Sequence, residues 1–190
     1  MSGDTGPAIE HVEIAAGAWQ LRPPHPREAE DALAMLADPL TRQWNDAEDV
    51  VDLATAREWC ERGADWSDGR HATFSVLDAT TGRLAGNVSL WQIDLERTRS
   101  AWVGYRTAPW ARGQGVATTA LLALTGWAFG AVGIERISLP HTVGNDASCR
   151  VAEKAGYRLE GVMRGAWREP DGTRLDDHLH ARLNTDPSPG

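Results

Sequence analysis

The sequence is short of cysteine, of net positive charge and of long apolar runs. Its two cysteines, Cys60 and Cys149, both fall in expected helices and cannot form a disulfide framework, so we expect reduced thiols. The formal net charge of −8 argues against a protein that holds a nucleic-acid backbone by bulk electrostatics. No charged-then-apolar leader opens the chain, and no apolar run approaches the roughly 20 residues of a membrane helix. We therefore expect a cytoplasmic protein without nucleic-acid or membrane partners.

What the sequence does contain fits one globular domain. Its 190 residues, 42% hydrophobic and 24% charged, are enough to bury a single core. We predict one domain over residues 11–184, with flexible termini at residues 1–10 and 185–190, which are rich in small, polar and proline residues. Nine tryptophans accompany only two phenylalanines, and tryptophan either packs in a core or lines an aromatic substrate pocket. The candidates for such a pocket are Trp19, Trp44, Trp91, Trp102 and Trp167.

The hydrophobic pattern predicts an α+β protein. The expected strands cover residues 19–21, 73–77, 84–93, 101–106, 134–139, 157–168 and 174–183. The expected helices cover residues 26–37, 51–62, 116–129 and 147–155. The three strands from 73 to 106 have short connections, which favours an antiparallel meander. The helix at 116–129 is a crossover, so the strands that hold Val103 and Ile137 are expected to be parallel.

A glycine-rich loop at Arg112–Thr118 follows a strand and opens a helix. Small residues let backbone N–H groups approach a ligand, and the unpaired amides of a helix start favour an anion such as a phosphate. Arg112 can add a charged donor. The loop lacks the Gly-Lys-Ser/Thr of a Walker loop. A Rossmann loop is disfavoured as well, because Thr118 replaces a small residue and Glu135 begins the next strand instead of ending it.

The loop resembles the coenzyme A loop of the GCN5-related N-acetyltransferase (GNAT) superfamily, Gln/Arg-x-x-Gly-x-Gly/Ala, here Arg112-x-x-Gly115-x-Ala117. Upstream, Trp102–Tyr105 is similar to the family strand that ends in Gly-Tyr. Downstream, Asn145–Ser148, Glu153–Tyr157 and Glu160-Gly161 resemble motifs of the RimJ/RimL-type branch, which acetylates the N-termini of ribosomal proteins. The resemblance covers roughly residues 17–183, and three spaced motifs in the right order are more specific than any one alone.

The resemblance implies a three-layer fold, with a mixed, mostly antiparallel sheet of about seven strands flanked by helices and two splayed parallel strands at the cofactor site. It implies acetyl-CoA as cosubstrate and no metal. Asn145 and Ser148 are the implied catalytic residues, with Ser148 protonating the departing thiolate, because the position of the usual tyrosine is Ala152. The implied cofactor-binding residues are Trp102, Val103, Gly104, Tyr105, Arg112, Gly113, Gln114, Gly115, Val116, Ala117, Thr118, Asn145, Ser148, Arg150 and Lys154. The family strand also carries a bulge whose amides polarise the thioester.

The general base is not given by the resemblance. Trp102 occupies a position where relatives usually carry a carboxylate, and the glutamate proposed as base in the N-terminal acetylases aligns with Trp167 or its neighbours Arg168 and Glu169. His141, at the end of a strand, has the right chemistry for a base, although a lone histidine is more often a packed or surface residue. Glu160 and Asp94 are weaker candidates. A free α-amine titrates near 8, so direct attack without a dedicated base is also open.

Several functions fit these motifs. The acceptor is a primary amine, either a peptide N-terminus or a small molecule. A module that binds coenzyme A without catalysis, for sensing or immunity, is an alternative, as is transfer of another acyl group such as succinyl. A homodimer is compatible with the sequence.

Overall fold

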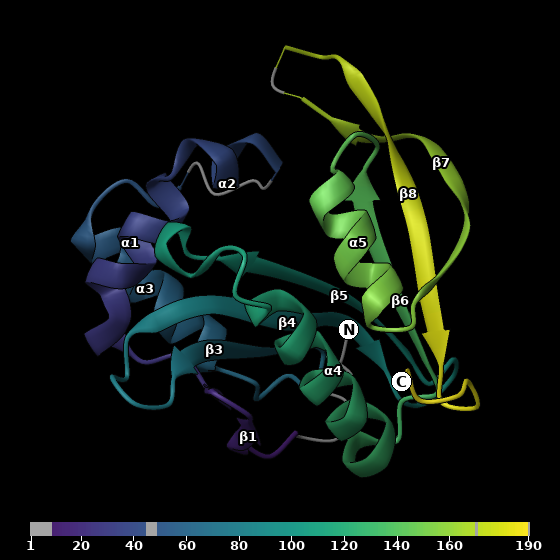
Figure 1. The fold of residues 1–190 in the computed structure, drawn as a ribbon, viewed down its shortest axis with the longest axis horizontal. Helices are drawn as coiled ribbons and strands as arrows, with labels where there is room; N and C mark the ends of the chain where they lie inside the picture. The colour runs from purple at the N-terminus through teal and green to yellow at the C-terminus, as the bar shows by residue number, and fades with distance from the viewer. Residues whose placement is uncertain (1–8, 45–48, 170, 190) are drawn as a thin grey trace, which may run out of the picture.

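A computed structural model describes residues 9–44, 49–169 and 171–189 of the chain, and its centre is a mixed sheet with the strand order β1-β2-β3-β4-β5-β6-β8-β7 (Figure 1). The strands are β1 (Ile14–Ala16), β2 (Trp19–Arg22), β3 (Ala72–Asp78), β4 (Leu84–Asp94), β5 (Ser100–Thr107), β6 (Arg136–Thr142), β7 (Arg158–Arg168) and β8 (Arg174–Leu183). The helices are α1 (Ala29–Ala37), α2 (Pro39–Trp44), α3 (Leu53–Ala64), α4 (Val116–Trp127) and α5 (Asp146–Lys154). The predicted α+β architecture is confirmed.

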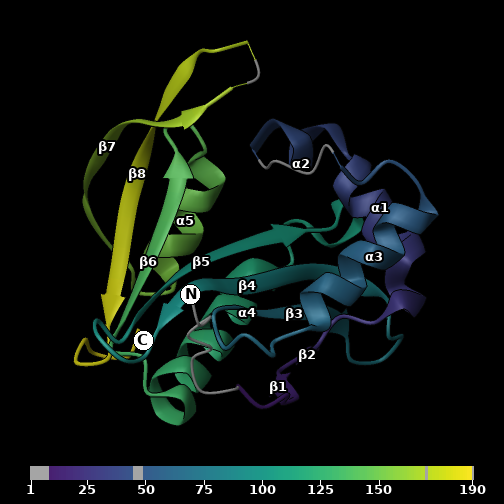
Figure 2. The ribbon, with the colours of Figure 1, turned by 180° about the vertical axis from the view of Figure 1, so that it is seen from behind.

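Helices cover both faces of the sheet (Figures 1 and 2). On one face, α4 and α5 pack on apolar side chains of the central strands, including Phe74, Val88 and Val103. On the other face, α1 and α3 form a second apolar cluster with Leu77 and Leu84 at one end of the sheet. No helix within the described ranges is long and apolar enough to cross a membrane.

Helix α4 forms because its sequence is rich in alanine and leucine and its small and apolar residues recur at helical spacing. Val116, Ala120, Leu121 and Leu124 are buried against the sheet. The helix continues into a π-helical turn at Ala128–Val132, where the sequence pattern had predicted an α-helix to residue 129. The crossover from β5 to β6 is thus carried by a well-packed helix, which allows the two strands to run parallel.

The parallel pair β5 and β6 is short. Only Ser100–Trp102 pair with Arg136–Ser138, and beyond these residues the two strands diverge. Strand β6 pairs instead with β8 along its whole length, from Arg136 opposite Leu183 to Thr142 opposite Asp177. The predicted pair of splayed parallel strands is confirmed, and Figure 1 shows β6 and β8 turning away from the direction of β5.

Two elements were not expected from the sequence. Strand β1 has three residues, too few for a periodic signal, and it raises the strands from about seven to eight in the described part of the chain. Asp38-Pro39 does end α1 as predicted, but Pro39 then opens α2, a position that proline tolerates because the first N–H of a helix has no intrahelical partner.

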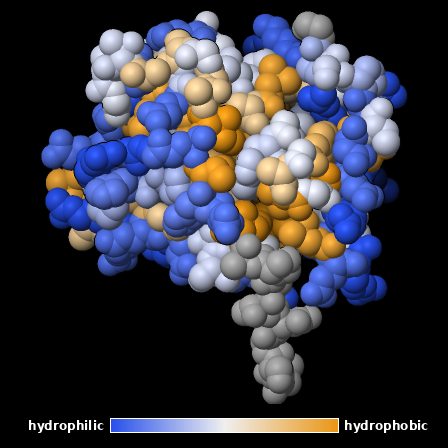
Figure 3. Space-filling model, turned by 90° about the horizontal axis from the view of Figure 1, so that it is seen from below, coloured by the Kyte–Doolittle hydropathy of each residue, from blue (hydrophilic) through white to orange (hydrophobic). Residues whose placement is uncertain are grey.

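The molecular surface is mostly hydrophilic, with apolar surface concentrated on particular faces. Seen from below, apolar side chains form a band in the middle of the molecule between hydrophilic margins (Figure 3). The edge strand β7 also exposes large apolar side chains, among them Leu159 and Val162. The hairpin of β7 and β8 projects away from the rest of the sheet, as Figure 2 shows.

Burial of α4 gives a prediction for stability. Leu121 is fully buried, so Leu121→Ala should lower the free energy of unfolding by about 2–5 kcal/mol, the usual range for removing a buried leucine side chain. Leu40 on α2 is 49% exposed, and Leu40→Ala is the matched control with a much smaller expected loss. Urea unfolding followed by circular dichroism measures both. Equal losses for the two variants would contradict the assignment of α4 to the core.

Candidate functional site

The divergence of β5 and β6 opens the sheet at the carboxyl ends of both strands. Beyond Trp102, β5 keeps β4 as a partner, with Trp102–Thr107 opposite Gly86–Trp91, but it has no partner in β6. Backbone N–H and C=O groups of a strand alternate between its two sides, so those of Val103–Thr107 that face the opening lack a strand partner. Such groups are available to a ligand lying in the opening.

The bulge expected in the strand of Val103 lies instead in its neighbour. From Trp102 to Thr107 the pairing with β4 is regular, and the shift in register places Gln92 and Ile93 of β4 opposite Ala101 alone. Gln92 takes a positive φ of 50° there. The following turn is fixed by the Asp94 carboxylate, which accepts hydrogen bonds from the amides of Glu96, Arg97 and Thr98.

The first turns of α4 and α5 lie at the open end, because β5 leads into α4 through the glycine-rich loop and β6 leads into α5 (Figure 1). The two helix starts differ. Asn145 caps α5, and its Oδ1 accepts a hydrogen bond from the Ser148 amide at 3.1 Å. The N-cap of α4 is Gly115, which has no side chain to cap the helix. The first amides of α4 are therefore free for an anion.

Glycine is required in this loop. Gly113 and Gly115 have φ values of 76° and 77°, in the left-handed region that other residues rarely adopt. A Cβ atom built at either position meets no heavy atom within 4 Å, so open space lies in front of the loop. The predicted loop residues Val116, Ala117 and Thr118 form the first turn of α4 directly behind it. Gln114 folds back, with its amide nitrogen donating to the carbonyl of Trp110 at 2.9 Å.

Arg112 was expected to add a charged donor to the anion site, but its guanidinium is engaged elsewhere. Its Nη2 forms an ion pair with Asp38 and donates to Thr41 Oγ1 at 3.1 Å. Asp38 also caps α2, since its carboxylate accepts from the Thr41 amide at 2.9 Å. The hydrogen bond from Arg112 is the main reason that the pKa of Asp38 lies below its ordinary value. Arg112 thus ties the glycine-rich loop to the junction of α1 and α2.

A hydroxyl pair spans the distance between β5 and α5. Tyr105 Oη lies 2.7 Å from Ser148 Oγ, and it donates to the carbonyl of Ser148 at 3.1 Å. Ser148 is buried, and burial raises the pKa of Tyr105 well above its ordinary value, so the phenol keeps its proton at neutral pH. Sequence reasoning placed both residues at the cofactor but missed their contact, because Tyr105 and Ser148 are 43 residues apart.

The other predicted residues divide between the two faces of the sheet. Val103 is fully buried under α4, whereas Gly104 lies under the indole of Trp91, where a Cβ atom would come within 3.0 Å of the ring. Arg150 and Lys154 are exposed on α5. His141 is buried on the face covered by α5, among His178, His180 and Cys149, and burial lowers the pKa of His141. Its role as the base stays a prediction.

A polar cavity of about 340 Å³ lies on the opposite face, beside α3. Its lining is Asp49, Trp59, Arg62, Gly63, Thr73, Asn87, Ser89 and Arg106. Asn87 is buried, and its Oδ1 has no hydrogen-bond partner. Among the described lining residues the only tryptophan is Trp59, which was not among the tryptophans predicted for a pocket. The cavity reaches β5 at Arg106, next to the opening of the sheet.

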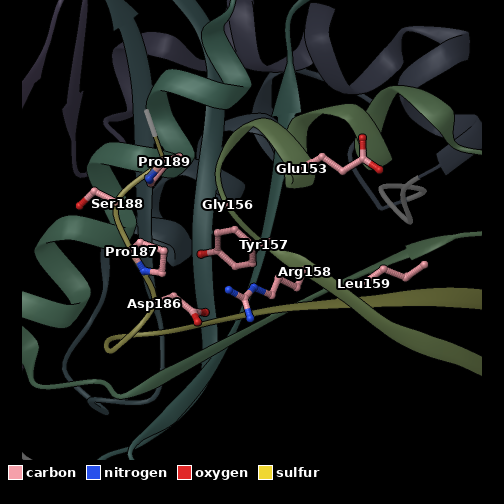
Figure 4. A pocket seen from close by; sticks show the side chains of 9 residues that line it. All are labelled: Glu153, Gly156, Tyr157, Arg158, Leu159, Asp186, Pro187, Ser188 and Pro189. Atoms are coloured by element: carbon pink, nitrogen blue, oxygen red, sulfur yellow. The ribbon is translucent and has the colours of Figure 1, made fainter.

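A second cavity, of about 470 Å³, lies at the other end of α5 (Figure 4). Glu153 and residues 156–159 line it together with the segment Asp186–Pro189. Neither the glycine-rich loop nor Ser148 contributes to its walls. We therefore place the candidate site at the opening between β5 and β6 and not in this larger cavity.

Comparison with known proteins finds relatives among acetyltransferases. Residues 19–158 match the family described as "Acetyltransferase (GNAT) domain". The chain is 33% identical over 102 residues to "Probable N-acetyltransferase YjcK" of Bacillus subtilis (strain 168); the match covers 50% of this chain and 56% of that protein, so the chain spans little more than half the length of this relative.

Solved structures share the fold. Mycobacterium smegmatis RimJ in complex with CoA-disulfide superposes with a TM-score of 0.79 at 26% identity, covering 98% of this chain and 92% of that one. RimL, a ribosomal L7/L12 α-N-protein acetyltransferase in complex with coenzyme A, gives a TM-score of 0.82 at 21% identity, covering 92% and 100%.

The ion pair behind the loop predicts a dependence of stability on pH. Because the folded-state pKa of Asp38 is lowered, its carboxylate stabilises the fold above the unfolded-state pKa near 4, and this contribution is lost as the pH falls through the folded-state pKa. Asp38→Asn should lower the free energy of unfolding by about 1–2 kcal/mol at pH 7, and the gap to wild type should narrow towards pH 3.

Urea unfolding at several pH values measures this gap. Glu58→Gln, which removes an exposed ion-pair partner of Arg62, is the control with hardly any expected change. A gap for Asp38→Asn that stays constant from pH 7 to pH 3 would show that the charge of Asp38 does not stabilise the fold.

Proposed function

The chain belongs to the GNAT acetyltransferase family, and on this premise we propose that it transfers the acetyl group of acetyl-CoA to a primary amine. The observation that carries the proposal is the uncapped start of α4, behind Gly113 and Gly115, at the open end of the diverging strands β5 and β6. This arrangement offers an anion site next to unpaired strand amides, which a pyrophosphate joined to a thioester arm requires.

The cosubstrate would bind along the opening. Free amides of Val116, Ala117 and Thr118 would hold the pyrophosphate, because an unpaired helix start favours negative charge. The pantetheine arm would pair with the open side of β5 beyond Trp102 in the manner of an added strand. Structures of RimJ with CoA-disulfide and RimL with coenzyme A support this placement by their shared fold.

Acetyl transfer has two steps, and residues at the opening would assist both of them. A neutral amine nitrogen attacks the thioester carbonyl carbon, and amides of β5 near Val103 that face the opening would stabilise the negative charge on oxygen. The carbon–sulfur bond then breaks, and the thiolate takes a proton from Ser148 Oγ. Tyr105, 2.7 Å from that oxygen, would return a proton to Ser148 and at once regain one from solvent, so that both hydroxyls end protonated. The proton lost by the amine passes to solvent.

The amine would reach the thioester from the polar cavity on the α3 face. Asn87 offers a buried oxygen without a partner, which suits an N–H donor, while the Asp49 carboxylate in the lining is paired with Arg62. Among the described residues that line the cavity, Trp59 is the one aromatic side chain, so they form no aromatic pocket for a large apolar acceptor. Both a peptide α-amine and a small polar amine fit these features.

Binding of the cosubstrate can be tested by thermal unfolding. Acetyl-CoA at about 100 times its Kd should stabilise the chain by about 2.7 kcal/mol, a Tm shift of roughly 5–10 °C. Gly115→Glu should abolish the shift, because its carboxylate would occupy the anion site. Gly82 has a similar φ of 71° and equally open surroundings in a remote turn, so Gly82→Glu is the matched control and should keep the shift.

An unchanged Tm of the wild type at millimolar acetyl-CoA would overturn the proposed binding. If the Gly115→Glu variant keeps the full Tm shift with acetyl-CoA, the pyrophosphate does not bind at the start of α4.

The hydroxyl pair predicts a kinetic signature. Ser148→Ala should lower kcat by about tenfold or more while the KM for acetyl-CoA changes little, because a lost proton donor acts on the departure of the thiolate. Tyr105→Phe should lower kcat less, and the double variant should match Ser148→Ala, since the two hydroxyls act in series. Ser67→Ala, in an exposed turn, is the control that keeps kcat.

Assays use a panel of peptides and small amines, with acetyl-CoA and succinyl-CoA compared as donors. Full kcat in Ser148→Ala, with chemistry rate-limiting, would contradict the role of Ser148. Absence of turnover with every amine and either donor, despite cofactor binding, would favour a non-catalytic module.

A further inference from the structure

Three histidines and one cysteine from three different elements converge beneath α5. They are His141 on β6, Cys149 on α5, and His178 and His180 on β8. One nitrogen or sulfur atom of each residue lies within 4.8 Å of the corresponding atoms of the others. The His141 and His180 rings stack with centroids 5.2 Å apart, and His178 lies edge-on to His141 at 5.3 Å.

The sheet register produces this convergence. In the antiparallel ladder of β6 and β8, His141 is directly opposite His178, so both side chains leave the sheet on the same face. His180 is two residues further along β8 and shares that face. Helix α5 covers the face and supplies Cys149, whose Sγ lies 3.7 Å from His180 Nε2. A shift of one residue in the register would separate the group.

Backbone carbonyls orient two of the rings as in metal sites. His141 Nδ1 lies 3.2 Å from the carbonyl oxygen of Thr142, and His180 Nδ1 lies 3.3 Å from that of Tyr157. A carbonyl oxygen only accepts, so each of these bonds fixes the ring hydrogen on Nδ1 and leaves a lone pair on Nε2. Histidines that bind metals usually donate their second ring N–H in this way.

Two ring nitrogens of the cluster are buried without partners. His141 is 8% exposed and His180 is fully buried. His141 Nε2 and His178 Nδ1 have no hydrogen-bond partner. A buried polar atom without a partner costs about 1–3 kcal/mol, and two in one cluster are unusual in a well-packed protein. A bound cation would satisfy both nitrogens together with the thiolate of Cys149.

We propose that His141, Cys149, His178 and His180 bind one zinc ion. Imidazole nitrogen and thiolate sulfur are the ligands that zinc prefers, and four protein ligands are typical of its closed structural sites. A tetrahedral zinc site places ligand atoms about 3.3–3.6 Å apart, given Zn–N near 2.05 Å and Zn–S near 2.3 Å. The observed spread of up to 4.8 Å requires a contraction of about 1 Å, which small rotations of the Cys149 and His178 side chains, the two partly exposed members of the cluster, can supply.

The ion would have a positioning role. Cys149 is adjacent to Ser148 in the chain, so zinc would fasten the first turn of α5 to β6 and β8 and hold the Ser148 hydroxyl towards Tyr105. A closed site leaves no coordination position for substrate, so the metal would not take part in the chemistry. Only this effect on Ser148 rests on the proposed function; zinc binding itself does not.

Metal binding is tested on the full chain without an affinity tag. After removal of metals with a chelator, the chain should take up one equivalent of zinc, measured by equilibrium dialysis and elemental analysis. Cobalt(II) should replace zinc and give tetrahedral ligand-field bands with a thiolate-to-cobalt charge-transfer band. Zinc should also raise Tm, because it binds the folded state.

Matched variants locate the site. Cys149→Ser should lose the charge-transfer band, and His141→Asn should lower zinc affinity by more than the roughly 10–100-fold typical of a lost second-shell partner. Cys60→Ser and His71→Asn replace the same residue types outside the cluster and should keep both properties.

The proposal is overturned if the folded wild type does not retain zinc or gives no cobalt spectrum. This test does not depend on whether the variants fold. An unchanged cobalt spectrum in folded Cys149→Ser would also overturn the proposal. These measurements need neither acetyl-CoA nor an amine, so a chain that binds zinc but transfers no acetyl group would contradict only the proposed function.

Discussion

The early divergence of two parallel strands is the constraint on which the rest of this structure depends. Strands β5 and β6 share only three paired positions, and β6 then follows β8. Backbone polar groups need partners, so the open side of β5 favours a ligand that can pair with it. The same divergence brings the starts of α4 and α5 to one end of the sheet, since each helix follows one of the diverging strands (Figure 1). Asn145 caps the start of α5, whereas the start of α4 has no side-chain cap and its free amides can bind an anion.

Two contacts fix the elements around the opening: one spans it, and the other lies behind the glycine-rich loop. Tyr105 and Ser148 connect β5 to α5, while Arg112 and Asp38 connect the glycine-rich loop to α1 and α2. The face beneath α5 carries the histidines and Cys149, whereas the polar cavity with Asn87 lies on the opposite face. The sheet therefore separates the residues that would fix α5 from those that would receive the amine. Strand β5 contributes to both sides, since Tyr105 bonds Ser148 of α5 and Arg106 lines the polar cavity.

Sequence reasoning predicted what depends on local pattern. The crossover helix, the meander, the closing hairpin and the glycine-rich loop all follow from periodicity, turn residues and spaced motifs. It missed contacts between residues far apart in the chain, such as Tyr105 with Ser148, and Arg112 with Asp38, which are 74 residues apart. His141 looked isolated in the sequence, and only the register of β6 with β8 places it opposite His178. The short strand β1 and helix α2 lack enough residues for a periodic signal.

The central claim is that the open side of β5 and the start of α4 together hold the cofactor. Amide hydrogen exchange with and without acetyl-CoA, resolved by mass spectrometry of peptides, tests it most directly because it reports on these backbone groups. Slower exchange should be confined to the β5 segment after Trp102, to residues 113–119, and to the first turn of α5. Protection centred instead on the cavity lined by Asp186–Pro189, with no change at β5 and α4, would contradict the account.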